Sequence, residues 1–308
     1  MKVHEIMIDV PGGRIWAGIY GSDRPGIPLL VVHGGPGAPH DYLESLAVLS
    51  DERAVIFYDQ LGCGNSERPE DCALWTLERA VEELSVVRST LKLERVHLLG
   101  QSWGALLATT YLIQRSQSGV AGVTLSAPLL STPRWMEDQH DWMLLMPDEM
   151  QKSVADAERT GDFVAPAYQA AMQAYYQRHL CRLDPWPDCL NRTFEKMGMD
   201  VYLTMWGPSE FTATGNLRDT DISSRLGEIS IPVLITCGRY DEASPDTASW
   251  YQQLIPGARM EVFENASHMH HFECQEQYLK SVQEFMAGAE KSMGFVGETT
   301  YEHSFFGL

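Results

Sequence analysis

The feature that most constrains this chain is the pentapeptide Gly-Gln-Ser-Trp-Gly at residues 100–104, which lies between two apolar runs. Residues 96–99 predict a buried strand, and residues 105–111 predict the start of a helix. A strand, a sharp turn and a helix in this order expose the hydroxyl of the central serine, Ser102, on the turn. A serine hydroxyl is a weak nucleophile by itself, so other residues must supply a base and N–H donors for the developing negative charge.

A second motif, His-Gly-Gly-Pro-Gly at residues 33–37, follows a buried strand predicted at 29–32. Glycines let the backbone approach a substrate closely, so we expect Gly34 to contact the substrate and the Gly35 N–H to face the oxyanion. The second oxyanion donor would be the backbone N–H of Trp103, the residue after the nucleophile. A plain turn after a strand is the alternative interpretation of these glycines.

An acid and a base follow later in the chain. Asp241 comes after an apolar strand predicted at 231–238, and His268 follows a further strand predicted at 260–263. The chain order Ser102, Asp241, His268 is typical of an α/β-hydrolase. His268 would accept the proton of Ser102, and Asp241 would orient the imidazole and stabilise its charged form. The competing residues are Asp246, His270 and His271.

Five segments together resemble the proline iminopeptidases of the α/β-hydrolase superfamily, the group that includes the archaeal tricorn-interacting aminopeptidase. These segments are residues 33–37, 59–66, 100–104, 206–211 and 238–245. The resemblance implies a serine exopeptidase that removes one N-terminal residue, often proline, from a peptide, amide or arylamide. An amino-acid amidase, esterase or lactonase on the same scaffold is the nearer alternative, and a non-catalytic binding protein is the more remote one.

The resemblance also implies a pair of glutamates that recognise the free α-ammonium group of the substrate. These positions fall on Glu210, in the segment Gly-Pro-Ser-Glu-Phe, and on Glu242, which follows the predicted triad aspartate. A charge-assisted contact to an ammonium group is strongest where water is excluded. Solvated surface glutamates are the alternative. Trp206 and Phe211 flank Glu210, so we expect them to line an apolar substrate pocket.

Strand and helix patterns alternate along most of the chain, which predicts an α/β fold with a mostly parallel sheet. Residues 1–20 predict an opening antiparallel pair. Strand patterns vanish between residues 130 and 226, where helices are predicted at 135–145, 166–179 and 191–205. We therefore predict a core of residues 1–129 and 227–290, an inserted helical cap of residues 130–226, and a C-terminal tail of residues 291–308.

The amino-acid composition limits the kinds of binding partner that we expect for this protein. The formal net charge of −19 disfavours nucleic acid and anionic membrane surfaces. No apolar run has the length of a membrane span, and the N-terminal residues lack the apolar core of a signal peptide. The six cysteines have no metal-ligand spacing, and no glycine-rich loop suggests a nucleotide, so no metal and no cofactor are expected. We expect a cytoplasmic enzyme, and the sequence leaves its oligomeric state open.

Overall fold

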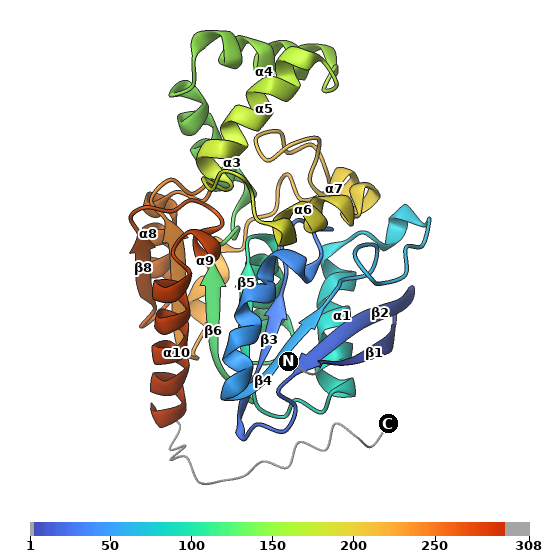
Figure 1. Ribbon diagram of the computed structural model, residues 1–308, viewed down its shortest axis with the longest axis vertical. Helices are drawn as coiled ribbons and strands as arrows, with labels where there is room; N and C mark the ends of the chain where they lie inside the picture. Colours follow the sequence, from blue (N-terminus) through green and yellow to red (C-terminus); the bar gives the residue numbers. More distant parts are fainter. Residues whose placement is uncertain (1–2, 293–308) are drawn as a thin grey trace.

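The structure, a computed structural model that describes residues 3–292, is built on an eight-stranded sheet (Figure 1). Its strand order is β1-β2-β4-β3-β5-β6-β7-β8. The strands are β1 (Val3–Val10), β2 (Gly13–Tyr20), β3 (Gly26–Val32), β4 (Arg53–Tyr58), β5 (Val96–Gln101), β6 (Val120–Ser126), β7 (Val233–Gly238) and β8 (Arg259–Phe263). β2 pairs antiparallel with β1 and β4, and every other neighbouring pair is parallel. The predicted mostly parallel sheet is therefore confirmed.

Side chains of the central strands alternate between two hydrophobic cores, one on each face of the sheet. In β3, Leu30 and Val32 contribute to one core, whereas Leu29 and Val31 contribute to the other. Helices α1 (Leu77–Thr90), α2 (Trp103–Gln114) and α8 (Pro245–Leu254) supply residues to the first core. The 3₁₀ helix η1 (His40–Asp51) and helix α10 (Gln275–Ser292) supply residues to the second. Burial on both faces explains why these strands are continuous apolar runs.

Helices also fill the long segment between β6 and β7, which we call the cap. They are α3 (Thr132–Leu144), α4 (Asp148–Thr160), α5 (Pro166–His179), α6 (Asp188–Glu195) and α7 (Met199–Met205). In Figure 1 the parallel strands β3, β5 and β6 point toward this segment. The carboxyl ends of parallel strands are where α/β sheets place their ligands, so the cap roofs the edge of the sheet that carries the site. The division at residues 130 and 226 stays a prediction.

Two cap elements differ from the sequence-based expectation. The helix predicted at 191–205 is divided into α6 and α7, because Gly198 donates its N–H to the carbonyl oxygen of Gly37 at 2.9 Å. A Cβ atom at Gly198 would lie only 2.3 Å from the carbonyl oxygen of Gly62, so glycine permits this docking of the cap onto the core. Helix α4 was not predicted. Its buried residues are Val154 and Ala157, and two buried positions are too few to give the apolar periodicity that predicts a helix.

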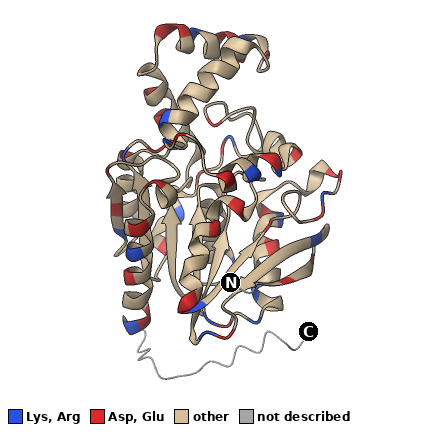
Figure 2. Cartoon of the chain, viewed as in Figure 1, with Lys and Arg blue, Asp and Glu red and all other residues tan. Residues whose placement is uncertain are grey.

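The remaining short elements are η2 (Cys72–Leu74), η3 (Ser223–Glu228) and α9 (His270–Glu273). Helix α10 continues through residue 292, and the rest of the predicted tail, residues 293–308, lies outside the described residues. Figure 2 marks the positions of acidic residues along helices of both the core and the cap, with basic residues interspersed. Between residues 3 and 292, no helix is long and apolar enough to cross a membrane.

Candidate active site

Ser102 occupies a strained turn between β5 and α2. Its φ of 55° and ψ of −120° are rare for a residue with a side chain. The flanking glycines make this turn feasible. A Cβ atom at Gly104 would lie 2.1 Å from the carbonyl oxygen of Val32, and one at Gly100 would lie 2.3 Å from that of Gly104. The strand-to-helix turn predicted from the pentapeptide therefore presents Ser102 at the N-terminus of a buried helix.

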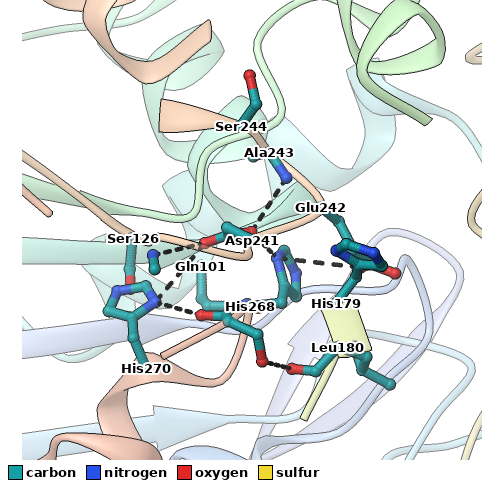
Figure 3. A network of polar contacts seen from close by, with 12 residues as sticks. Gln101, Ser126, His179, Leu180, Asp241, Glu242, Ala243, Ser244, His268 and His270 are labelled. Carbon is teal, nitrogen blue, oxygen red and sulfur yellow. Dashed lines mark hydrogen bonds and ion pairs between the residues drawn. The ribbon is translucent and has the colours of Figure 1, made fainter. Parts of the chain in front are cut away.

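Asp241 and His268 form a buried hydrogen-bonded pair (Figure 3). The Nδ1 atom of His268 lies 2.7 Å from Oδ1 of Asp241. The same oxygen accepts the Ala243 N–H at 3.0 Å, and Oδ2 accepts the Gly238 N–H at 3.1 Å. Backbone donors therefore hold the carboxylate, and the imidazole must carry its proton on Nδ1 to donate to it. The other nitrogen, Nε2, is then the proton acceptor that a serine hydroxyl requires. Ser102 and His268 line the same cavity.

The competing acid and base residues do not line the cavity, although Nδ1 of His270 lies 3.8 Å from Oδ2 of Asp241. His270 is buried against the hydroxyl oxygens of Ser126 and Thr236, at 3.1 and 2.9 Å. Burial lowers the pKa of His270 to about 4 and that of His271 to about 3. Asp246 is exposed in the first turn of α8. None of the three belongs to the lining of the cavity that holds Ser102.

The glycines of the residue 33–37 motif have different roles. Gly34 donates its N–H to the hydroxyl oxygen of Tyr42 at 2.7 Å, so this donor is occupied. Gly35 has a φ of 108° and lines the cavity beside Ser102. Trp103 is the first residue of α2, a position where the backbone N–H has no acceptor within the helix. Gly35 and Trp103 thus remain the candidate oxyanion donors, whereas the N–H of Gly34 is already engaged; of the three residues, only Gly35 belongs to the cavity lining.

Two carboxylates face the same cavity. Glu242 is fully buried, and neither of its carboxylate oxygens has a hydrogen-bond partner among the described residues. Burial and the neighbouring Glu210 raise the pKa of Glu242 well above its usual value. Glu210 is partly buried and accepts the hydroxyl of Tyr202 at 2.6 Å. Burial also raises the pKa of Glu210, although the Tyr202 hydrogen bond and the charge of His268 act in the opposite direction.

The cavity has a volume of about 220 Å³. Its wall is mostly apolar and includes four methionines, which the sequence analysis did not single out: Met172, Met197, Met199 and Met269. They come from the cap and from the loop after His268, so no local motif in the sequence marks them. Methionine side chains are flexible and adapt to irregular ligands.

Trp206 and Phe211 do not belong to the cavity lining, in contrast to the expectation. Trp206 is buried and packs edge-on against Trp135, with ring centroids 6.0 Å apart. Phe211 packs against Tyr168 and Tyr175 inside the cap. Both therefore support the wall from behind, because burying a large ring in the cap stabilises it more than exposing that ring to the cavity. The aromatic lining comes instead from Tyr42, Tyr176, Phe194 and Tyr202.

The described part of the chain offers no group of three or more His, Cys, Asp or Glu side chains that could hold a metal ion. The site consists of a serine, a hydrogen-bonded histidine–aspartate pair, backbone donors at the end of a helix, and two carboxylates, one buried and one partly buried. This set can carry out acyl transfer through a covalent serine intermediate.

Comparison with known proteins identifies the family. Residues 27–274 match the model of the alpha/beta hydrolase fold family. The chain is 41% identical over 283 residues to the proline iminopeptidase of Heyndrickxia coagulans, covering 92% of this chain and 98% of that one. It is 37% identical to the proline iminopeptidase of Lactobacillus crispatus, covering 93% and 99%. The crystal structure of proline iminopeptidase from Mycobacterium smegmatis superposes with a TM-score of 0.87 at 32% identity, covering 94% and 100%. The chain therefore belongs to the proline iminopeptidase family of α/β hydrolases.

Proposed function

We propose that the protein is a serine exopeptidase that releases one N-terminal residue, proline or another apolar residue, from peptides, amides or arylamides. The observation that carries this proposal is the buried carboxylate of Glu242, whose two oxygens have no hydrogen-bond partner among residues 3–292. A buried carboxylate without a partner is costly, so a protein retains one where a ligand supplies the partner. A cationic α-ammonium group is such a ligand.

The second carboxylate completes the ammonium site in this proposal. The hydroxyl of Tyr202 fixes one oxygen of Glu210 and leaves the other for the ligand. Two carboxylates in one water-poor cavity repel each other, and a bound cation removes this repulsion. An enzyme that cleaves neutral esters would gain nothing from this arrangement, which favours a peptidase over a general esterase.

The chemistry follows from the geometry of the pair Asp241–His268. His268 takes the proton of Ser102 through Nε2 while the serine oxygen attacks the carbonyl carbon of the first residue. The N–H groups of Gly35 and Trp103 stabilise the oxyanion. His268 then protonates the leaving amine, which departs and leaves an acyl-serine. Water, activated by the same histidine, hydrolyses the acyl-enzyme and restores Ser102.

The cavity and the thiols support the class of substrate and the cellular setting that we propose. The mostly apolar wall suits an uncharged side chain, and a volume of about 220 Å³ suits a small acyl group. All six cysteines are free, as in proteins of a reducing compartment, which supports the cytoplasm as the location. The net charge of −19 likewise favours a cationic ligand over nucleic acid or an anionic membrane.

Hydrolysis of a matched pair of substrates tests the proposal. Proline arylamide with a free amine should be cleaved, and N-acetylated proline arylamide should not, because acetylation removes the positive charge. Cleavage of both compounds, or of the acetylated one alone, would contradict the ammonium site and favour an amidase or esterase. Failure to cleave any of a panel of amino-acid arylamides, amides and esters, together with no labelling of Ser102 by a fluorophosphonate, would favour a binding protein.

A further inference from the structure

Three consecutive carbonyl oxygens in the loop after β7 accept hydrogen bonds from side chains of the cap. Nδ1 of His179 lies 2.9 Å from the carbonyl oxygen of Tyr240. Nε1 of Trp142 donates to that of Asp241 at 2.9 Å, and Nε2 of Gln139 donates to that of Glu242 at 2.9 Å. This loop carries both the acid of the proposed triad and Glu242, whose carboxylate has no hydrogen-bond partner among the described residues and lies 4.0 Å from Nδ1 of His268. We call these three donors, Gln139, Trp142 and His179, the cap latch.

Hydrogen bonds to consecutive carbonyls fix consecutive peptide planes. The direction of a side chain depends on the two peptide planes that flank its Cα atom, so the cap latch sets the directions of Asp241 and Glu242. Asp241 must reach His268, and Glu242 must reach the cavity. The backbone donors of Gly238, at the end of β7, and Ala243 hold the Asp241 carboxylate itself, but both lie within five residues of one another along the chain around Asp241. The cap latch ties the carbonyl side of this loop to the cap, and Asp138 of α3 adds a further tie by accepting from the N–H and the hydroxyl of Ser244.

The cap also holds the loop that carries the base. The backbone N–H of His268 donates to the carbonyl oxygen of His179 at 3.0 Å, and that of Met269 donates to the carbonyl oxygen of Leu180 at 2.9 Å. His179 therefore contacts both catalytic loops, through its ring and through its carbonyl. Figure 3 shows His179 and Leu180 beside Asp241, Glu242 and His268.

The ring of His179 is itself fixed by packing. It lies between Trp142 and Tyr175, with ring centroids 4.6 and 4.8 Å away. Burial lowers the pKa of His179 to about 4, so the ring is neutral near pH 7. Because Nδ1 faces a carbonyl oxygen, it carries the proton and acts as a donor. Trp142, Tyr175 and His179 come from α3 and α5, so two helices of the cap contribute to one rigid contact.

We propose that the cap latch is a positioning device for the catalytic machinery, so that the Asp241–His268 pair is aligned with Ser102 only while the cap is seated on the acid loop. Gln139, Trp142 and His179 are thus positioning residues that act through Asp241 and Glu242. The inference rests on the proposed roles of Ser102, Asp241 and His268, but not on the identity of the substrate.

Trp142→Phe is the variant of choice, because it removes the indole N–H and keeps an aromatic ring. Trp186→Phe is the matched control: Trp186 is also half-buried in the cap, but its Nε1 donates to the carbonyl oxygen of Cys181, inside the cap. The readouts are the rate at which a fluorophosphonate labels Ser102 and the kcat and KM for a proline arylamide. We expect Trp142→Phe to lower the labelling rate and kcat about fivefold to tenfold and to raise KM, because the latch also sets the direction of Glu242; Trp186→Phe should change none of the three.

A double-mutant cycle separates positioning from a general loss of stability. In an Asp241→Asn background, Trp142→Phe should lower the labelling rate by less than about twofold, because the carboxylate through which it acts is gone. A loss of equal size in both backgrounds would contradict the proposal, as would a wild-type labelling rate in Trp142→Phe. If Trp142→Phe does not fold, His179→Phe, which also removes one latch donor and keeps a ring, is held to the same outcomes. Failure of the wild-type enzyme to be labelled would instead contradict the proposed role of Ser102.

Discussion

Replacement of Glu242 by glutamine tests separately how much the buried carboxylate destabilises the folded protein and how much it contributes to catalysis. Neither oxygen of Glu242 has a hydrogen-bond partner among the described residues, and its side chain is fully buried. Glutamine has nearly the same shape without the charge. An unsatisfied buried polar group costs about 1–3 kcal/mol, and a charged one costs more. The glutamine amide is still a buried polar group, so only the additional cost of the charge is removed, and we expect Glu242→Gln to stabilise the free enzyme by about 1 kcal/mol at pH 7, which corresponds to a rise in Tm of about 2 °C.

The same substitution should weaken catalysis. A hydrogen bond to a charged group contributes about 1.5–3 kcal/mol, so its loss should lower kcat/KM for proline arylamide about 10- to 150-fold. Burial raises the pKa of Glu242 above its usual value of 4.5. The folded state then holds a proton that the unfolded state releases, so the carboxylate destabilises the protein increasingly as the pH rises above about 4.5. The gain in Tm should therefore be small near pH 4 and larger at pH 7.

Thermal unfolding at both pH values and steady-state kinetics test this reasoning. Glu284→Gln is the control, because Glu284 is an exposed residue of α10 and should change neither Tm nor kcat/KM. A lower Tm for Glu242→Gln at pH 7 would refute the argument, since it would mean that the carboxylate has a stabilising partner in the free enzyme. Undiminished activity on the free-amine substrate would refute the ammonium role.

Three further predictions concern the nucleophile, the turn that carries it and the far end of α10. Ser102→Ala should lower kcat by about 10⁴-fold or more and abolish fluorophosphonate labelling, with an unchanged circular dichroism spectrum. Gly104→Ala should destabilise the protein by about 3 kcal/mol in urea unfolding, because its Cβ would lie 2.1 Å from the last carbonyl oxygen of β3. A Cβ atom at Gly288, in contrast, would have no other heavy atom within 4 Å, so Gly288→Ala should stabilise the protein by about 0.5–1 kcal/mol. Burial alone would raise the pKa of Glu290, but His97 and Arg53 outweigh burial and lower that pKa below 4.5. Glu290→Gln should therefore destabilise the protein at pH 7, and this destabilisation should disappear as the pH falls below about 4.5. Equal urea midpoints for wild type and Glu290→Gln at pH 7 would contradict the last of these.

The fold could be predicted because each central strand corresponds to a short apolar run in the sequence. Residues 29–32 are apolar throughout and residues 96–99 are apolar except for His97, as suits strands buried on both faces, and the structure confirms strands there. The cap was harder to predict. The break between α6 and α7 depends on the docking of Gly198 against Gly37 and Gly62, which are far away in the sequence. No local pattern contains that contact.

The chemistry that we propose for this chain can be inferred from local features of its sequence. The backbone strain at Ser102 requires glycines on either side, and the order of Ser102, Asp241 and His268 follows from the order of the parallel strands. The first constraint involves only neighbouring residues and the second only the order of the strands along the chain, so both can be recognised in the sequence.

How the side chains are used depends on the tertiary structure. It gives the N–H of Gly34 to Tyr42, turns Trp206 and Phe211 away from the cavity, and leaves the carboxylate of Glu242 without a hydrogen-bond partner among residues 3–292. Each outcome depends on side chains that approach from distant segments, mostly of the cap. The physical reason is that burial and hydrogen-bond satisfaction are properties of the packed molecule, whereas backbone strain and apolar periodicity are properties of the local chain.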